Sequence, residues 1–283
     1  MPEEIPLRDL PESVLEEVAR ILAPYVIGFV SYTRTPNGSD VQLLGSGTLV
    51  SLGSTKAILT AEHVVRILPR DGRLGLVISQ TPQRHDVDVQ GLTYLRIARG
   101  TQDEDGPDLG AVVLSPAIAA ALAARKSFYD LSLRREQLLK SPPDIKEGMW
   151  FINGFVDEYT WEELDAGKKL RIKGFYNLSG AGGPNDGVVV REHDYFEFPV
   201  SPGGRASAPN NFGGMSGGGL WQFALVKNDK GLKPARPLLS GVVFYQYGTP
   251  DAQYGVKCHG RRSVYRVAYD AIQELANKKP PTN

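Results

Sequence analysis

VQLLGSGTLVSLGSTKAILTAEHVV, residues 41–65, is rich in aliphatic and β-branched side chains and is interrupted by glycine and serine. The stretches 41–52 and 56–59 predict two strands, and Gly53-Ser54 predicts the turn between them. Residues 60–65 (TAEHVV) predict one helical turn directly after the second strand. His63 is therefore expected where a strand ends, on a rigid scaffold beside a loop.

The same texture continues on both sides of this stretch. Residues 25–33 predict a strand that a turn at 36–39 joins to 41–52. Further short strands are predicted at 74–78, 87–98 and 109–114, so we expect residues 24–115 to form a closed antiparallel barrel of about six strands. Residues 1–23 are expected to form a helical extension, because Leu15, Val18 and Leu22 share one face of a predicted helix over 11–22.

The second half of the chain repeats this organisation after a helical connector. Residues 116–143 are rich in alanine, leucine and arginine and predict helix. Short strands are then predicted at 148–156, 170–178, 187–190, 195–200, 217–225 and 238–247. A second barrel is thus expected over 144–262, followed by a C-terminal helix and tail over 263–283. The expected fold is all-β: two antiparallel six-stranded β-barrels with an N-terminal helix, a helical inter-barrel connector and a C-terminal helix.

Composition narrows the function classes. The 283 residues include 32 Lys plus Arg and 32 Asp plus Glu, so no net charge draws the protein toward nucleic acid or a membrane. No apolar run approaches the roughly 20 residues that span a bilayer. Cys258 is the single cysteine, which excludes an internal disulfide, and the amino terminus lacks the pattern of a secretory signal. We therefore expect a cytoplasmic protein with neither nucleic acid nor membrane as its partner.

Three separated segments carry residues of nucleophilic catalysis. Ser216 lies in GGMSGG (213–218), His63 lies in TAEH (60–63), and Asp108 opens the apolar run PDLGAVVL (107–114). A catalytic serine needs a base, and the base needs a third group that orients it. Asp103 and Asp105 are nearby alternatives to Asp108, but only Asp108 directly precedes an apolar strand.

The glycines around Ser216 suggest a further role for the backbone. They permit conformations in which the amides of Gly214 and Ser216 point to one spot and form an oxyanion hole. Each feature also has a structural reading: a glycine-rich turn with an incidental serine, a histidine with a structural hydrogen bond, and a solvated aspartate. The combination of the three in one chain favours catalysis over these readings.

These motifs resemble those of the trypsin-like (chymotrypsin-fold) serine peptidases. In that family the histidine lies in a Thr-Ala-Ala-His-like segment, the aspartate begins Asp-Ile-Ala, and the serine lies in Gly-Asp-Ser-Gly-Gly. The order His63, Asp108, Ser216 and the His-to-Asp separation of 45 residues are similar. The resemblance implies a two-barrel serine endopeptidase with its site in the cleft between barrels, a protein or peptide substrate, and no metal or organic cofactor.

Two residues depart from the family pattern. Glu62 replaces a small residue before the histidine and is expected to face solvent. Met215 replaces the acid that pairs with a freshly cut amino terminus in secreted relatives, and no Ile-Val-Gly-Gly activation sequence is present. The oxyanion loop is therefore expected to be preorganised by packing, or by an activating partner or ligand.

The resemblance also places substrate-binding residues. Asn210, six residues before the serine, is expected at the base of the primary specificity pocket, with Asp194 or Asp251 as possible distant acids. Phe244, Tyr245 and Gln246 are expected on the strand that pairs with a bound peptide.

Two other classes of function remain open at this level. Residues 214–218 also fit Gly-x-Ser-x-Gly, the nucleophile elbow of α/β-hydrolase esterases, which would use His259 with Asp229 or Asp251. The preceding sequence lacks the alternating strand and helix pattern of that fold. A catalytically silent binding or scaffold protein on the peptidase fold is the other alternative. The remaining histidines, His85 and His193, have no ligand-like spacing, so no zinc site is expected.

Overall fold

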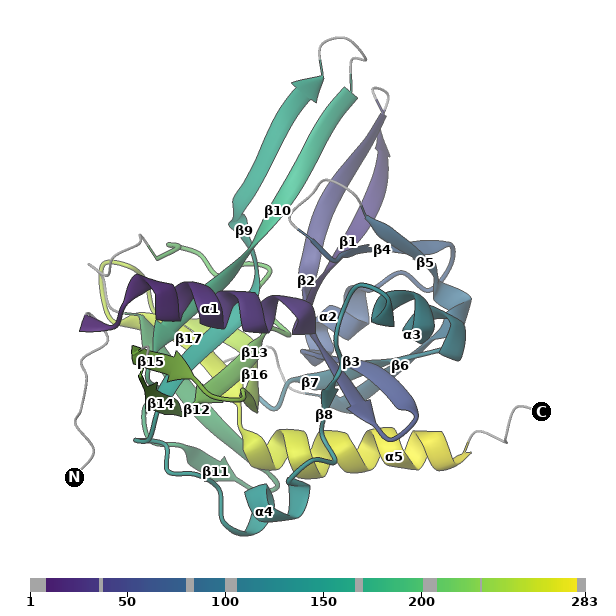
Figure 1. The fold of residues 1–283 in the computed structure, drawn as a ribbon. Helices are drawn as coiled ribbons and strands as arrows, with labels where there is room; N and C mark the ends of the chain where they lie inside the picture. The colour runs from purple at the N-terminus through teal and green to yellow at the C-terminus, as the bar shows by residue number, and fades with distance from the viewer. Residues whose placement is uncertain are drawn as a thin grey trace.

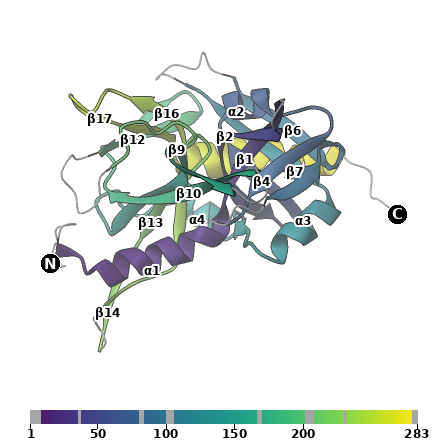
Figure 2. The same ribbon diagram turned by 90° about the horizontal axis from the view of Figure 1, so that it is seen from above.

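The computed structural model describes residues 9–35, 38–79, 84–99, 106–165, 170–200, 208–229 and 231–278. It is mostly β, with 49% strand and 24% helix, and its strands form two main antiparallel sheets that lie beside each other (Figures 1 and 2). Asp103 and Asp105 lie outside the described residues, as do Pro36 and Asn37 of the first predicted turn.

The first sheet comes from the N-terminal half of the chain and curls into a half-barrel. Its strands are β1 (Val26–Thr35), β2 (Gly38–Leu52), β3 (Thr55–Thr60), β4 (Arg73–Val77), β5 (His85–Asp88), β6 (Leu92–Ala98) and β7 (Leu109–Leu114), in the order β5-β4-β1-β2-β3-β7-β6. An added short strand, β8 (Tyr129–Asp130), pairs with β2 in parallel. The strand predictions around residues 41–65 are confirmed.

The second sheet comes from the C-terminal half, in the order β10-β9-β13-β16-β17-β12-β11. Its strands are β9 (Met149–Asp165), β10 (Leu170–Gly182), β11 (Val188–Val190), β12 (His193–Val200), β13 (Gly219–Phe223), β16 (Leu238–Tyr247) and β17 (Tyr254–His259). A separate hairpin joins β14 (Leu225–Asn228) to β15 (Gly231–Pro234). The sequence did not predict β17 or the extension of β9 to Asp165.

The expected pair of six-stranded barrels is confirmed only in part. Among the described strands, each main sheet is a linear series of pairs, the first sheet is a half-barrel, and two complete barrels are not confirmed. The long hairpins β1–β2 and β9–β10 instead project together from one end of the molecule (Figure 1). Phe155 and Phe175 on the second hairpin pack with Val30 and Leu43 on the first, so a shared apolar cluster joins the two projections.

Helices occupy the ends of the chain and the connection between the sheets. They are α1 (Glu12–Leu22) with the 3-10 turn η2 (Ala23–Tyr25), α2 (Glu62–Ile67), α3 (Pro116–Ala123), α4 (Arg135–Lys140), and the π-helical turn η4 (Ser263–Ala268) that continues into α5 (Tyr269–Lys278). The connector is therefore two short helices with β8 between them. Ser115 explains where α3 begins, because its hydroxyl accepts a hydrogen bond from the Ile118 amide and Pro116 follows it.

One apolar core crosses the boundary between the two sheets. It includes Val50 from the first sheet and Phe151 from the second, together with Val18 of α1 and Ile272 of α5, all essentially inaccessible to solvent. Burial of this surface favours a fixed arrangement of the sheets, because separating them would expose it to water. Cys258 is buried and unpaired. Among the described helices, none combines the length and the apolar character required to cross a lipid bilayer.

Phe151 provides a test of this shared core. Its ring lies 5.6 Å from that of Phe223 in an edge-to-face arrangement. Phe151→Ala should lower the free energy of unfolding by about 3–5 kcal/mol, since it removes buried surface and leaves a cavity. Urea denaturation measures this, with the exposed Val189→Ala on β11 as a control expected to stay within about 0.5 kcal/mol. Equal losses in the two variants would contradict a shared core at Phe151.

Candidate active site

His63 and Asp108 meet because the strands that precede and follow them are neighbours. β3 ends at Thr60, directly before α2, and β7 begins directly after Asp108, with Thr60 paired to Gly110. His63 Nδ1 lies 2.5 Å from Asp108 Oδ2, and the His63 amide donates to Asp108 Oδ1 at 2.9 Å. The structure therefore brings His63 and Asp108 into contact, as the sequence predicted, and the orienting role of Asp108 stays a prediction.

The environment of Asp108 keeps its carboxylate charged. Burial by itself raises the pKa of Asp108. Hydrogen bonds from the His63 ring and from the amides of His63 and Glu62, together with the electrostatic interaction with His63, lower the pKa by more than burial raises it, so the net shift is downward. The Asp108 side chain is 4% exposed and the His63 side chain 23%. The aspartate is therefore enclosed while the imidazole stays accessible.

His259 is a member of this cluster that sequence reasoning missed. Its Nε2 accepts a hydrogen bond from the Asp108 amide at 3.1 Å, and its Nδ1 lies 3.3 Å from Ser263 Oγ. Burial, together with the nearby His193, lowers the pKa of His259 to about 3, so the ring is neutral and remains an acceptor. Because β17 carries His259 and was not predicted, the sequence contained no signal for this contact.

Ser216 lies in a tight turn that needs glycine. Gly214 and Gly217 have φ values of +87° and +95°, which side chains rarely adopt. The Met215 amide donates to Phe212 O at 2.9 Å. Within the described part of the chain, the amides on either side of it, those of Gly214 and Ser216, have no hydrogen-bond acceptor. Two free amides are what an oxyanion would require.

Ser46, in the middle of β2, ties the serine turn to the first sheet. Its amide donates to Ser216 O at 2.8 Å and its hydroxyl donates to Gly214 O at 2.7 Å. The same hydroxyl accepts from the Phe155 amide at 2.7 Å, and Ser46 O accepts from Thr60 Oγ1 at 2.8 Å. The segment before His63 and the turn that carries Ser216 are thus bonded to one residue.

The Ser216 hydroxyl is close to this cluster but is not bonded to His63. Its Oγ donates to Phe244 O at 3.4 Å, and the Phe244 ring lies 4.8 Å from the His259 ring, which contacts Asp108. No hydrogen bond joins Ser216 to His63 among the residues that the structure describes. In the described arrangement, the Ser216 hydroxyl is directed to Phe244 O rather than bonded to the imidazole.

Glu62 is placed differently from the prediction. Its side chain is 2% exposed rather than facing solvent, and it forms an ion pair with Arg96 on β6. Burial of a carboxylate requires such a partner, and β6, which pairs with β7, supplies it. Met215 is also buried, and it packs in the core of the second sheet with Ile152 and Val156.

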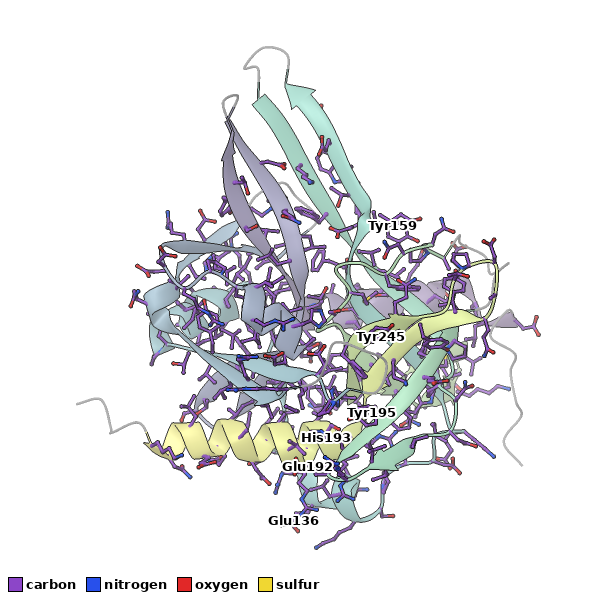
Figure 3. The ribbon with its side chains drawn as sticks, turned by 180° about the vertical axis from the view of Figure 1, so that it is seen from behind. Glu136, Tyr159, Glu192, His193, Tyr195 and Tyr245 are labelled. Carbon is purple, nitrogen blue, oxygen red and sulfur yellow. The ribbon has the colours of Figure 1, made fainter. Side chains whose placement is uncertain are left out.

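The residues predicted to bind substrate have mixed positions. Asn210 is exposed and donates to Glu158 at 3.3 Å, and Gln246 contacts its carbonyl at 3.4 Å. Phe244 is 2% exposed, so its side chain is part of the core, whereas Tyr245 on β16 is partly exposed (Figure 3). Gln246 also accepts from the Phe212 amide at 2.7 Å.

The two distant acids considered for the specificity pocket can also be placed. Asp194 is bonded to the amides of Arg262 and Ser263 at 2.9 and 2.7 Å, where the C-terminal helix begins, so it does not serve as a pocket acid. Asp251 lies in an exposed turn.

Comparison with known proteins adds no assignment. The chain matches no protein-family model, and no curated protein matches it. Functional inference therefore rests on the motifs and on the geometry of the cluster formed by His63, Asp108, His259, Ser46 and Ser216.

Ser46→Ala tests the link between the sheets. The substitution leaves the Phe155 amide and the Gly214 carbonyl without their partner, so we expect the free energy of unfolding to fall by about 1–3 kcal/mol. Urea denaturation monitored by tryptophan fluorescence measures this. Ser54→Ala, in the exposed β2–β3 turn, is the matched control and should leave stability unchanged. A loss in Ser54→Ala as large as in Ser46→Ala would argue against the proposed link.

Asp108→Asn tests the charge of the buried carboxylate. The pKa of Asp108 is lower in the folded protein than its ordinary value of 3.8, so its ionised form stabilises the fold above that value. This contribution is lost as the pH falls through the folded-state pKa. Between about pH 5 and pH 3, the unfolding free energy should therefore fall more steeply in the unaltered protein than in Asp108→Asn. Identical slopes would show that Asp108 is not stabilised as a carboxylate; Asp251→Asn is the control.

Proposed function

We propose that this chain is a serine endopeptidase in which Ser216 is the nucleophile, His63 the general base and Asp108 the residue that orients the base. The observation that carries the proposal is the contact of 2.5 Å between His63 Nδ1 and Asp108 Oδ2, because it leaves Nε2 as the ring nitrogen for proton transfer. The position of Ser216 in a glycine turn with two free amides supports it. In this proposal the two sheets correspond to the two barrels of the trypsin-like fold.

The proposed reaction begins when the Ser216 hydroxyl turns from Phe244 O toward His63 Nε2. Ser216 Oγ then attacks the scissile carbonyl while Nε2 takes its proton, and the Asp108 carboxylate stabilises the resulting imidazolium. The amides of Gly214 and Ser216 bind the developing oxyanion, each contributing about 3 kcal/mol. The proton passes from His63 to the leaving amine, which departs and leaves the acyl-enzyme. His63 then takes a proton from a water molecule that attacks the acyl group, and it returns this proton to Ser216 Oγ as the acid product leaves. Neither a metal nor a cofactor enters these steps.

The proposed substrate is an extended peptide. Backbone pairing with the end of β16, at Tyr245 and Gln246, would supply affinity that does not depend on sequence. Asn210 is uncharged, so it does not itself supply the acid that favours arginine or lysine. Glu158, which accepts a hydrogen bond from Asn210 at 3.3 Å, is a carboxylate beside the proposed pocket.

Activation is proposed to differ from that of secreted peptidases. Met215 is 1% exposed and stands where those enzymes carry an acid, and Ser46 already holds the Ser216 turn by two hydrogen bonds. Packing, with an activating partner or ligand, would then select the competent Ser216 rotamer. The lone buried Cys258 is consistent with work in a reducing compartment, and we propose the cytoplasm.

The second candidate function is a catalytically silent binding or scaffold protein. A silent protein of this kind would have the same fold as the peptidase but would not need a hydrogen bond between Ser216 and His63. The absence of that bond among the described residues favours this second function. The esterase alternative has less support. The main sheets are antiparallel, and His259, its required base, is buried and bonded to the Asp108 amide.

Active-site substitution and labelling distinguish these functions. Ser216→Ala, His63→Ala and Asp108→Asn should each lower cleavage of a protein substrate by about 10⁴-fold or more near neutral pH. A fluorophosphonate probe should label the unaltered protein at Ser216 and should not label Ser216→Ala. Ser54→Ala and His85→Gln are controls that should retain both activities. Absence of labelling in the folded, unaltered protein would support the silent scaffold, and full activity in Ser216→Ala would exclude the proposed mechanism.

A further inference from the structure

A cavity of about 400 Å³ lies where the C-terminal helix begins, outside the catalytic cluster. Its wall combines α4 and the residues after it, the beginning of β12, and the first turns of the C-terminal helix. Four arginines line it, Arg135, Arg261, Arg262 and Arg266, and so do the apolar side chains of Leu138, Leu139 and Phe196. Two aspartates, Asp194 and Asp270, complete the charged part of the wall, which leaves an excess of two positive charges.

The two aspartates are already engaged by other groups. Asp194 accepts hydrogen bonds from the amides of Arg262 and Ser263 and from the Ser263 hydroxyl at 2.9 Å, and so caps the helix. Asp270 accepts from Arg135 Nη2 at 2.7 Å. Both carboxylates are therefore occupied by these hydrogen bonds. Arg261, Arg262 and Arg266 can bond only to neutral groups or to a ligand.

Those three arginines have no carboxylate partner within the described chain. Arg261 is buried and donates to neutral acceptors, the Ser240 hydroxyl, the Pro143 carbonyl and the Gln222 amide oxygen. The Nε of Arg262 is buried and has no hydrogen-bond partner among the described residues, and Arg266 is exposed. The positive charge that these arginines bring to the cavity wall is therefore not neutralised by a direct ion pair with a described carboxylate.

The acids nearest in sequence to these elements do not fill the cavity. Glu136 on α4 and Glu192 before β12 are labelled in Figure 3. Glu136 is 85% exposed and pairs with Lys140 at 3.5 Å, and Glu192 is 70% exposed and lies 3.6 Å from His193. Both carboxylates are thus held in solvent, where they are screened.

We propose that this cavity binds a small phosphate-bearing molecule. Its phosphate oxygens accept charge-assisted hydrogen bonds from Arg262 and Arg266, whose planar guanidinium groups fit phosphate geometry. Its apolar or aromatic part lies against Phe196 and Leu138. The cavity volume is within the range of small-molecule sites.

A continuous set of hydrogen bonds leads from this cavity to the proposed catalytic cluster. Asp194 accepts from the Ser263 hydroxyl, which lies 3.3 Å from His259 Nδ1, and His259 Nε2 accepts from the Asp108 amide. The Arg262 amide donates to Asp194, so a ligand that moves Arg262 would also move the first member of this series of hydrogen bonds. Resting on the proposed function, we infer that the ligand regulates cleavage by changing how firmly Asp108 is held.

Isothermal titration calorimetry of the full chain with inorganic pyrophosphate, at ionic strength held constant with chloride, tests the site. We expect one site of millimolar affinity or tighter, weakened about tenfold or more in Arg262→Gln/Arg266→Gln. Arg262→Lys/Arg266→Lys keeps the charge and should bind with intermediate affinity. The matched control is Arg20→Gln, which removes a charge from α1, where Arg20 is 77% exposed, and should bind normally.

Three results would overturn the site. They are no heat of binding in the unaltered protein, unchanged binding in both double variants, and an equal loss in Arg20→Gln. If Arg262→Gln/Arg266→Gln does not fold, unchanged binding in Arg262→Lys/Arg266→Lys would by itself overturn the site.

Histidine NMR tests the connection without relying on catalysis. In ¹⁵N-histidine-labelled Ser216→Ala protein, pyrophosphate should shift the ring signals of His259 and His63, and Ser263→Ala should abolish the shift at His63 while retaining binding. His85 is the internal control, because it lines a separate cavity with Arg84 and Arg125. A shift at His85 with none at His259 would place the anion there and overturn the proposal. Binding with unchanged His63 signals and unchanged peptide cleavage would overturn the regulatory part, whereas absence of cleavage alone would count only against the peptidase function.

Discussion

Ser46 connects the two halves of this protein through its hydroxyl, its amide and its carbonyl. These groups bond to Phe155, Gly214, Ser216 and Thr60, so one residue of β2 fixes both the serine turn and the strand that leads to His63. A side chain at Gly217 would collide with Ser46 O, which explains why that position is glycine and has a positive φ. Everything proposed for the site depends on this junction, because it sets where Ser216 lies relative to His63.

Around the junction, buried carboxylates are stabilised by donors, whereas a buried histidine is kept neutral. Asp108 is kept ionised by donors from His63 and Glu62, and the Glu62 carboxylate is neutralised by Arg96. His259, fully buried in the same region, is instead kept neutral and supplies an acceptor to the Asp108 amide. The aspartate is thus held at its carboxylate and at its backbone, an arrangement that restricts its movement and that of the imidazole bonded to it. The same contacts would stabilise a non-catalytic protein, so they are necessary for the proposed reaction but not sufficient.

Much of the fold could be predicted from local pattern. The strands around residues 41–65, the helix over 12–22 and the C-terminal helix follow from hydrophobic periodicity and turn residues, which act over a few positions. Prediction failed where long-range pairing decides the outcome. β9 continues to Asp165 because β10 pairs with it along its length, and β17 is a strand because β16 and β12 lie on either side of it. Whether a sheet closes likewise depends on which edges meet, and the pairings of the described strands give a half-barrel and a second sheet rather than two confirmed barrels.

The candidate site shows the same division. Sequence by itself determined the β-rich class, the three residues His63, Asp108 and Ser216 as candidates, and the glycines that permit the Ser216 turn, since residue type and spacing limit local chemistry and backbone conformation. Tertiary structure alone decided that His63 contacts Asp108, that Glu62 is buried against Arg96, that Asp194 caps a helix, and that His259 supports Asp108. Hydrogen bonds and burial join residues far apart in the chain, and only the packing of the strands brings those residues within bonding distance.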